Sequence, residues 1–144
     1  MKKMSNDIVK TDNVGSLISA GVGASFCSVQ ADGDRKSAAK VYNALNNPDE
    51  RVADMINQDI AVTDVLIEIA EIANEETNEV STVPRVVLID DKGKTYQAVS
   101  FGMFNAVKNA ITVFGMPTWE PPLVFTIKQK PVRNGSMLTA EIKA

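Results

Sequence analysis

The sequence predicts a mostly β domain with one main α-helix, arranged as a small antiparallel barrel of five strands. Two turn signals, Asp32-Gly33 and Asp91-Lys92-Gly93, each stand between β-forming runs. Between the second of these hairpins and the end of the chain lies one run with a helical apolar stripe, residues 101–114. At 144 residues and 15.6 kDa, the chain has the size of one domain that can bury a core.

An N-terminal arm and a hairpin open the predicted order. Residues 1–22 are polar and interrupted by glycine, so we predict a flexible arm there and a folded domain over residues 23–144. The Asp32-Gly33 turn favours a strand over residues 36–45, although the alanines of this run also fit a helix.

A short helix and a long strand come next. Asn47 is a good N-cap and Pro48 suits the first helical position, so we predict a helix at residues 47–56. Residues 59–72 are rich in β-branched side chains, which favours a strand, although positions 62, 65, 66, 69 and 72 also fit a helical stripe. The acidic segment 74–82 is expected to form a loop.

The second half has stronger local signals. Residues 83–90 and 94–100 are predicted to form a hairpin, and residues 123–130 and 137–142 another. Between them, Ser100 is predicted to cap the helix, and Gly115 with Pro117 ends it. A helix between the third and fourth strands of a five-stranded antiparallel barrel is typical of the OB-fold.

The amino-acid composition excludes some kinds of catalysis and cross-linking. The chain has no histidine and one cysteine, Cys27, so imidazole catalysis and an internal disulfide are excluded, and a reducing cytoplasm is the expected location. We expect no cofactor or metal, no membrane partner and no catalytic residues. The net charge of −3 is unevenly distributed: residues 49–91 hold two basic and twelve acidic residues, whereas residues 92–144 hold seven basic and two acidic ones.

Basic residues gather on the three predicted hairpins. Lys128 and Lys130 are two apart on a strand and therefore share a face, and tyrosine follows lysine by two positions in both other hairpins. Cations that hold phosphate beside rings that stack on bases are what unpaired nucleic acid requires. The candidate nucleic-acid-binding residues are Arg35, Lys36, Lys40, Tyr42, Lys94, Tyr96, Lys128, Lys130 and Arg133.

Other interpretations of these residues stay open. The tyrosines also fit half-buried strand positions, and hairpin lysines also protect strand edges from aggregation. Pro48-Asp49 and Asp90-Asp91-Lys92 resemble pieces of a metal-dependent nuclease, but each equally fits a helix start or a turn. The four phenylalanines outside the first strand are expected in the core by their periodicity: Phe101, Phe104, Phe114 and Phe125.

Two long segments resemble a known family. Residues 40–57, KVYNALNNPDERVADMIN, and residues 84–123, from PRVVLIDDKGKTYQAVS to VFGMPTWEPPL, are similar to the single-stranded DNA-binding proteins of phages and conjugative plasmids of Gram-positive bacteria. The resemblance implies an OB-fold, no catalysis, and cooperative coating of single strands during replication or transfer. It also implies self-association, as a dimer or an array on DNA, for which the N-terminal arm is one candidate. An OB module that binds protein is the alternative.

Overall fold

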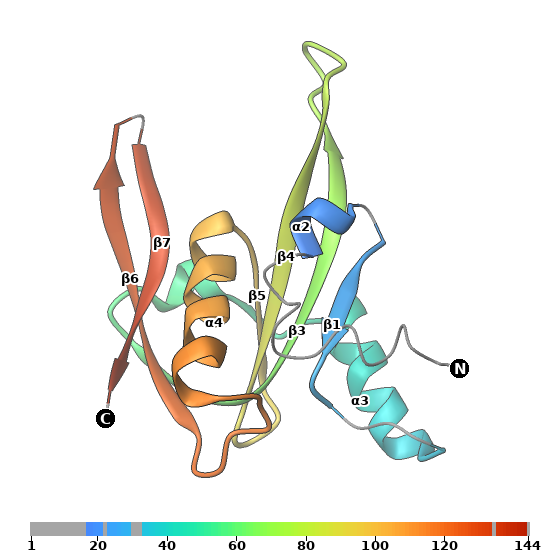
Figure 1. Ribbon diagram of the computed structural model, residues 1–144, viewed down its shortest axis with the longest axis vertical. Helices are drawn as coiled ribbons and strands as arrows, with labels where there is room; N and C mark the ends of the chain where they lie inside the picture. The colour runs from blue at the N-terminus through green and yellow to red at the C-terminus, as the bar shows by residue number, and fades with distance from the viewer. Residues whose placement is uncertain (1–16, 22, 30–32, 134, 144) are drawn as a thin grey trace.

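A curled, mostly antiparallel sheet forms the body of the protein in the computed structural model (Figure 1). The structure describes residues 17–21, 23–29, 33–133 and 135–143. Its strands run in the order β2-β5-β4-β3-β6-β7, and β1 pairs with β3 outside this path. The strands are β1 (Ser25–Cys27), β2 (Glu50–Arg51), β3 (Asp59–Ala73), β4 (Val80–Asp90), β5 (Thr95–Val99), β6 (Leu123–Val132) and β7 (Gly135–Lys143).

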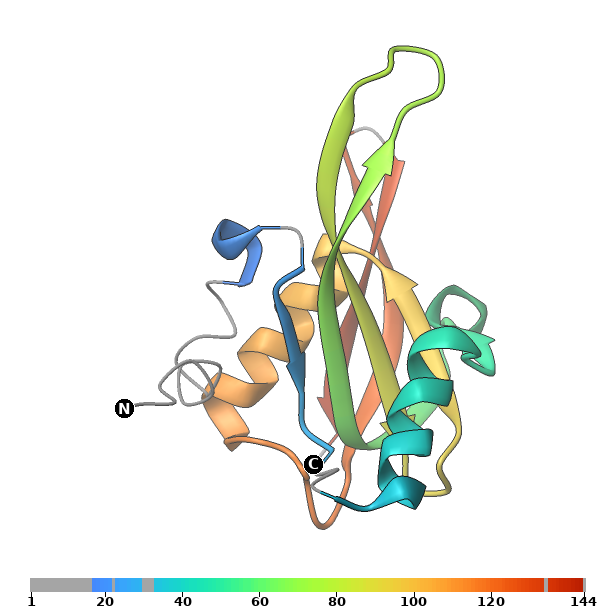
Figure 2. The same cartoon turned by 90° about the vertical axis from the view of Figure 1, so that its right-hand side faces the viewer.

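The strand order is consistent with an OB-like fold. The long strand β3 pairs antiparallel with both β4 and β6, and β5 and β7 extend the sheet on either side. The helix α4 (Phe101–Phe114) connects β5 to β6. Among the described residues no ladder joins β5 to β7, so the sheet is curled but not closed into a barrel. The two longer helices lie beside the sheet, α4 next to β7 and α3 (Arg35–Asn46) on the other side (Figure 2).

The main core fills the inside of the curled sheet. Val62, Val65 and Phe125 are fully buried there, and α4 adds Met103 and Val107 from one face. Ser100 caps this helix as predicted: the Met103 backbone N–H donates to Ser100 Oγ at 3.1 Å. Trp119 covers one end of the core with 5% of its surface exposed, and its indole N–H donates to the Gly115 carbonyl.

The prediction of a strand over residues 36–45 is wrong, because this segment belongs to α3. Asp34 is its N-cap: its carboxylate accepts from the Lys36 backbone N–H at 3.1 Å and from Ser37 Oγ at 2.8 Å. Ala44 is buried and Val41 is half-buried, so α3 packs on the outer face of the sheet. That small second core also contains Leu66, Val87, Ile89, Val29 and Leu45.

Two further elements differ from the sequence prediction. In place of a helix at residues 47–56, the chain forms the short strand β2 and the 3₁₀ turn η2 (Val52–Met55). The predicted acidic loop at 74–82 is shorter, because β4 already begins at Val80 and pairs with Ala73. The Asn74 side chain closes this turn by accepting from the backbone N–H of Glu76 at 2.8 Å.

The predicted N-terminal arm lies mainly outside the described residues, which begin at Leu17. Leu17–Ala20 form the short helix α2, and Leu17 is buried against the main core. Flexibility of residues 1–16, and the domain boundary at residue 22, stay predictions.

Candidate nucleic-acid interface

The end of the β6–β7 hairpin carries three cations, and none of them forms an ion pair with another described residue. Lys128, Lys130 and Arg133 lie within residues 128–140, which contain no aspartate or glutamate; we call this segment the basic hairpin. Lys130 and Arg133 are exposed and Lys128 is half-buried. Lys130 pairs across the ladder with Met137. Because alternate residues of a strand share a face, Lys128, Lys130 and Val132 line one surface of the hairpin.

The helix α3 holds the second group of candidates. Arg35, Lys36, Lys40 and Tyr42 are all exposed on this helix, and 63% of the Tyr42 surface is exposed. An exposed ring of this kind is available for stacking without any movement of the backbone.

The turn between β4 and β5 holds Lys94 and Tyr96, and it differs from the expectation in one respect. Tyr96 is buried, with 5% of its surface exposed, and its hydroxyl donates to Asp90 Oδ2 at 3.0 Å. Burial, followed by the neighbouring Asp90 carboxylate, raises the pKa of Tyr96 to about 12. Lys94 lies 5.9 Å over this ring and forms an ion pair with Glu50 at 3.4 Å. Tyr96 therefore supports the turn, and its ring is not presented to solvent.

The candidates gather into two places, not one. Lys40 and the β4–β5 turn line a common hollow of about 240 Å³, so α3 and this turn are neighbours. The tip of the basic hairpin lies at the opposite end of the molecule from them (Figures 1 and 2). The α3 and turn cations have as many carboxylates near them in sequence: Asp34, Asp49, Glu50, Asp90 and Asp91. Uncompensated positive charge is therefore concentrated on the basic hairpin.

The aspartates of the nuclease hypothesis hold backbone in place. Asp49 Oδ2 accepts from the Thr95 backbone N–H at 3.0 Å, and Asp90 Oδ1 accepts from the backbone N–H groups of Lys92 and Lys94. In the part of the chain that the structure describes, no three acidic or cysteine residues converge as a metal site would require. These carboxylates are turn and strand-end residues.

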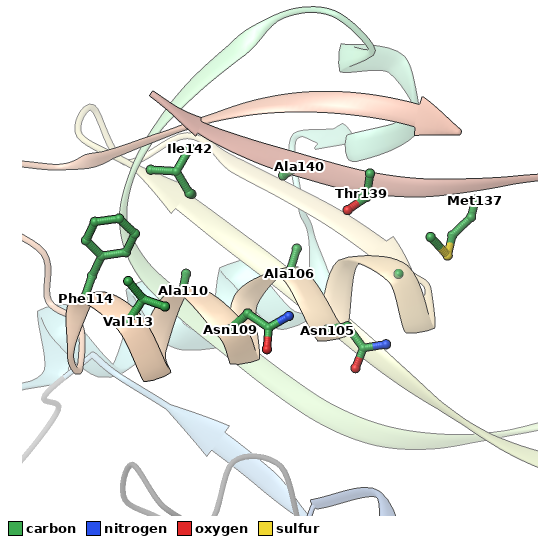
Figure 3. Close-up of a pocket in the computed structure, with 11 residues that line it drawn as sticks. Asn105, Ala106, Asn109, Ala110, Val113, Phe114, Met137, Thr139, Ala140 and Ile142 are labelled. Carbon is green, nitrogen blue, oxygen red and sulfur yellow. The ribbon is translucent and has the colours of Figure 1, made fainter. Parts of the chain in front are cut away.

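Sequence reasoning missed two exposed aromatic rings. Phe101 and Phe114 begin and end α4, and 49% and 51% of their surfaces are exposed, so the prediction that they lie in the core is wrong; Phe104 and Phe125 are buried as predicted. Phe114 borders a hollow of about 270 Å³ between α4 and β7, which Asn105, Asn109 and Met137 also line (Figure 3). Their positions at the two ends of the helix could have indicated this exposure, because the terminal residues of a helix extend beyond the elements that its centre contacts.

The family model described as phage single-stranded DNA-binding protein, of the Phi29 type, matches residues 20–143. The chain belongs to this family. The resemblance seen in residues 40–57 and 84–123 is thereby confirmed for the phage proteins. Searches of curated proteins and of solved structures found no match.

Family membership indicates single-stranded DNA binding, and the family is one of DNA-binding proteins, not of enzymes. No helix in the described ranges has the length and apolar character needed to cross a membrane. The matched range includes every candidate residue on α3, on the β4–β5 turn and on the basic hairpin.

Proposed function

We propose that this protein binds single-stranded DNA without marked sequence preference and coats strands exposed during phage replication in the host cytoplasm. The observation that carries the proposal is the basic hairpin, with three cations and no acidic residue over residues 128–140, in a chain of the phage family. Phosphate neutralisation is independent of sequence, and the release of counterions supplies most of such affinity.

We place the DNA-binding strands within an OB-fold. The pairing of β3 with β4 and β6, and the position of α4 between β5 and β6, support this assignment. In OB-folds, oligonucleotides are bound between the loop that joins the first two strands and the loop that joins the last two. The basic hairpin is the second of these loops.

The nine candidate residues have unequal roles in this proposal. Lys128, Lys130 and Arg133 contact phosphates first, and Tyr42 supplies a stacking surface beside the cations of α3: Arg35, Lys36 and Lys40. Lys94 is partly committed to Glu50, and Tyr96 acts indirectly by fixing the turn.

Fluorescence anisotropy of labelled oligothymidine and a matched duplex, at about 50 and 200 mM salt, tests the function. We expect preference for the single strand and weaker binding at the higher salt. The triple variant Lys128→Ala, Lys130→Ala, Arg133→Ala should lower the slope of log affinity against log salt by about 2, at about 0.7 per phosphate contact. Arg51→Ala is the matched control, because Arg51 is paired with Asp54 at 3.0 Å.

Unchanged affinity in the triple variant would refute the assignment of the basic hairpin. No binding of the wild-type protein at low salt would refute the function itself and favour the protein-binding OB module. A role in conjugative transfer stays a prediction.

Cooperative binding through the N-terminal arm belongs to the same proposal. Deleting residues 1–12 should reduce cooperativity on long DNA while the domain stays folded. A binding isotherm of unchanged steepness would remove the arm from the proposal.

A further inference from the structure

Two hairpins project from the same end of the molecule. In both views the turn that joins β3 to β4 and the turn that joins β6 to β7 lie at the top, beyond the body of the sheet (Figures 1 and 2). One is the basic hairpin. The other, residues 71–82, contains four glutamates and no lysine or arginine, and we call it the acidic hairpin.

The two hairpins carry opposite charges, and these charges form no ion pairs with other described residues. Glu71, Glu75, Glu76 and Glu79 are all exposed, as are Lys130 and Arg133. In the described residues, none of the charged side chains of either hairpin takes part in an ion pair, whereas four ion pairs form elsewhere on the surface. The positive and negative hairpins therefore do not neutralise each other in one copy of the chain.

Apolar side chains are exposed at the same end. On the acidic hairpin, 46% of Ile72 and 56% of Val80 are exposed; on the basic hairpin, 46% of Val132 and 39% of Met137 are exposed. Val99 and Phe101, where β5 ends and α4 begins, are half exposed as well. Six of the nine exposed large hydrophobic residues of the described chain thus belong to these two hairpins and to the junction beside Met137. Apolar residues gathered in this way indicate an interaction surface.

We propose that this end of the molecule is a self-complementary interface for a second copy of the same chain. In a twofold dimer each surface patch meets its own copy, so a patch must be complementary to itself. Two hairpins of opposite charge on one end meet this condition, because the basic hairpin of each copy then lies beside the acidic hairpin of the other.

The two kinds of side chain have different parts in this interface. Exposed ion pairs contribute little affinity, but complementary charge orients the partners and speeds their encounter. The exposed valines, isoleucine, methionine and phenylalanine supply the apolar area that affinity needs. Lys128, Lys130 and Arg133 are also the proposed phosphate contacts, so single-stranded DNA and a second copy compete for the basic hairpin.

Charge reversal tests the proposal without depending on DNA binding. The wild-type protein should sediment as a dimer at about 50 mM salt, and its dissociation constant should rise at about 500 mM, where the screening length is below about 5 Å. The acidic variant set is Glu75→Lys, Glu76→Lys, Glu79→Lys, and the basic set is Lys128→Glu, Lys130→Glu, Arg133→Glu. Each set alone should weaken dimerisation by at least about a hundredfold, since like charges placed together cost several kcal/mol.

Mixing the two reversed variants provides the decisive control. One variant then has two positive hairpins and the other two negative ones, so an equimolar mixture should form a heterodimer. The variant that carries all six substitutions should dimerise again. Circular dichroism and unfolding midpoints establish that each variant is folded.

Three results would overturn the interface: a wild-type monomer at low salt, a dimer that survives either reversal, or no recovery in the mixture. These results are separate from the oligothymidine assay, which can succeed or fail independently.

Discussion

Replacing Gly102 with alanine sets two well-known effects against each other. Gly102 is the second residue of α4, and a methyl group there would overlap the carbonyl oxygen of Leu138 on β7 and lie 2.8 Å from Met137 Cγ. Helix propensity alone predicts that alanine stabilises the protein, by up to about 1 kcal/mol. Close packing predicts the opposite, since the obstacle is strand backbone and not the end of a flexible side chain.

The packing effect should prevail. Inserting a methyl group into a filled contact costs about 1–3 kcal/mol, and here α4 must move away from β7 to make room. Because the obstacle is backbone, the cost lies in the upper part of this range, at about 2–3 kcal/mol; after the propensity gain is subtracted, we expect Gly102→Ala to lower the free energy of unfolding by about 1–2 kcal/mol. Hydrogen exchange should also become faster in the first turn of α4 and in β7.

Urea unfolding followed by circular dichroism measures the free energy of unfolding. Asn105→Ala is the matched control, because Asn105 is exposed on the same helix and its replacement should stabilise the protein by about 0.5 kcal/mol. A Gly102→Ala protein that is as stable as the wild type, or more stable, would refute the close approach of α4 to β7.

Three further predictions concern buried polar groups. Asp64 is 6% exposed and accepts from Ser28 Oγ at 2.8 Å and Thr118 Oγ1 at 2.6 Å, so Asp64→Ala should cost about 1–3 kcal/mol in urea unfolding, and Asp64→Asn less. The pKa of Tyr96, about 12, lies above its ordinary value of about 10, so the protonated phenol is favoured in the folded state. Its contribution to stability should persist below pH of about 10 and disappear as the pH rises through about 12; an absorbance titration at alkaline pH should lose this phase in Tyr96→Phe. Arg85 joins three elements by donating to the Leu45 carbonyl at 2.6 Å, to Glu68 at 3.0 Å and to Gln97 at 3.1 Å, so Arg85→Met should increase hydrogen exchange in α3, and unchanged protection there would contradict this role.

Elements whose start, end and internal periodicity are all marked by the local sequence could be predicted. The hairpin of β4 and β5 has the Asp91-Lys92-Gly93 turn between two β-forming runs, and α4 has both a serine cap and a glycine after its last residue. In each case the residues that start and end the element agree with the periodicity inside it. The strand β3, with its β-branched residues, belongs to the same group.

The segment of α3 was predicted as a strand because the Asp32-Gly33 turn can precede either a hairpin or a helix. Asp32-Gly33 precedes a hairpin in many proteins, but a glycine turn followed by Asp34 and Ser37 equally begins a helix, with Asp34 as its cap. Val41, Ala44 and Leu45 then have helical spacing, and all three pack on the sheet. A test for caps would have favoured the helix.

The acidic hairpin had no periodic signal to find. Residues 71–82 are exposed on both faces of the hairpin, so hydrophobic and polar residues need not alternate there. A half-buried Tyr96 was one of two interpretations that the sequence left open, and the choice between them depends on Asp90 and on the packing of η2 and β5, which only the tertiary structure brings together.

The sequence identifies the basic residues, but whether each positive charge is neutralised depends on the carboxylates that the fold places beside it. Lys94 is 3.4 Å from Glu50, so its charge is already partly neutralised where it lies. On the basic hairpin, Lys128 has Asp59 as its acidic neighbour; that carboxylate is held at 2.7 Å by Lys143, which with Thr126 lowers the pKa of Asp59, and Lys128 adds only a minor effect. From Lys128 to Arg133 the strand advances by about 17 Å, at about 3.3 Å per residue, which exceeds the screening length of about 8 Å at physiological salt. We therefore expect a phosphate at the tip to interact with Lys130 and Arg133 and to be screened from Asp59, so that a chain with net negative charge can bind a polyanion at this hairpin.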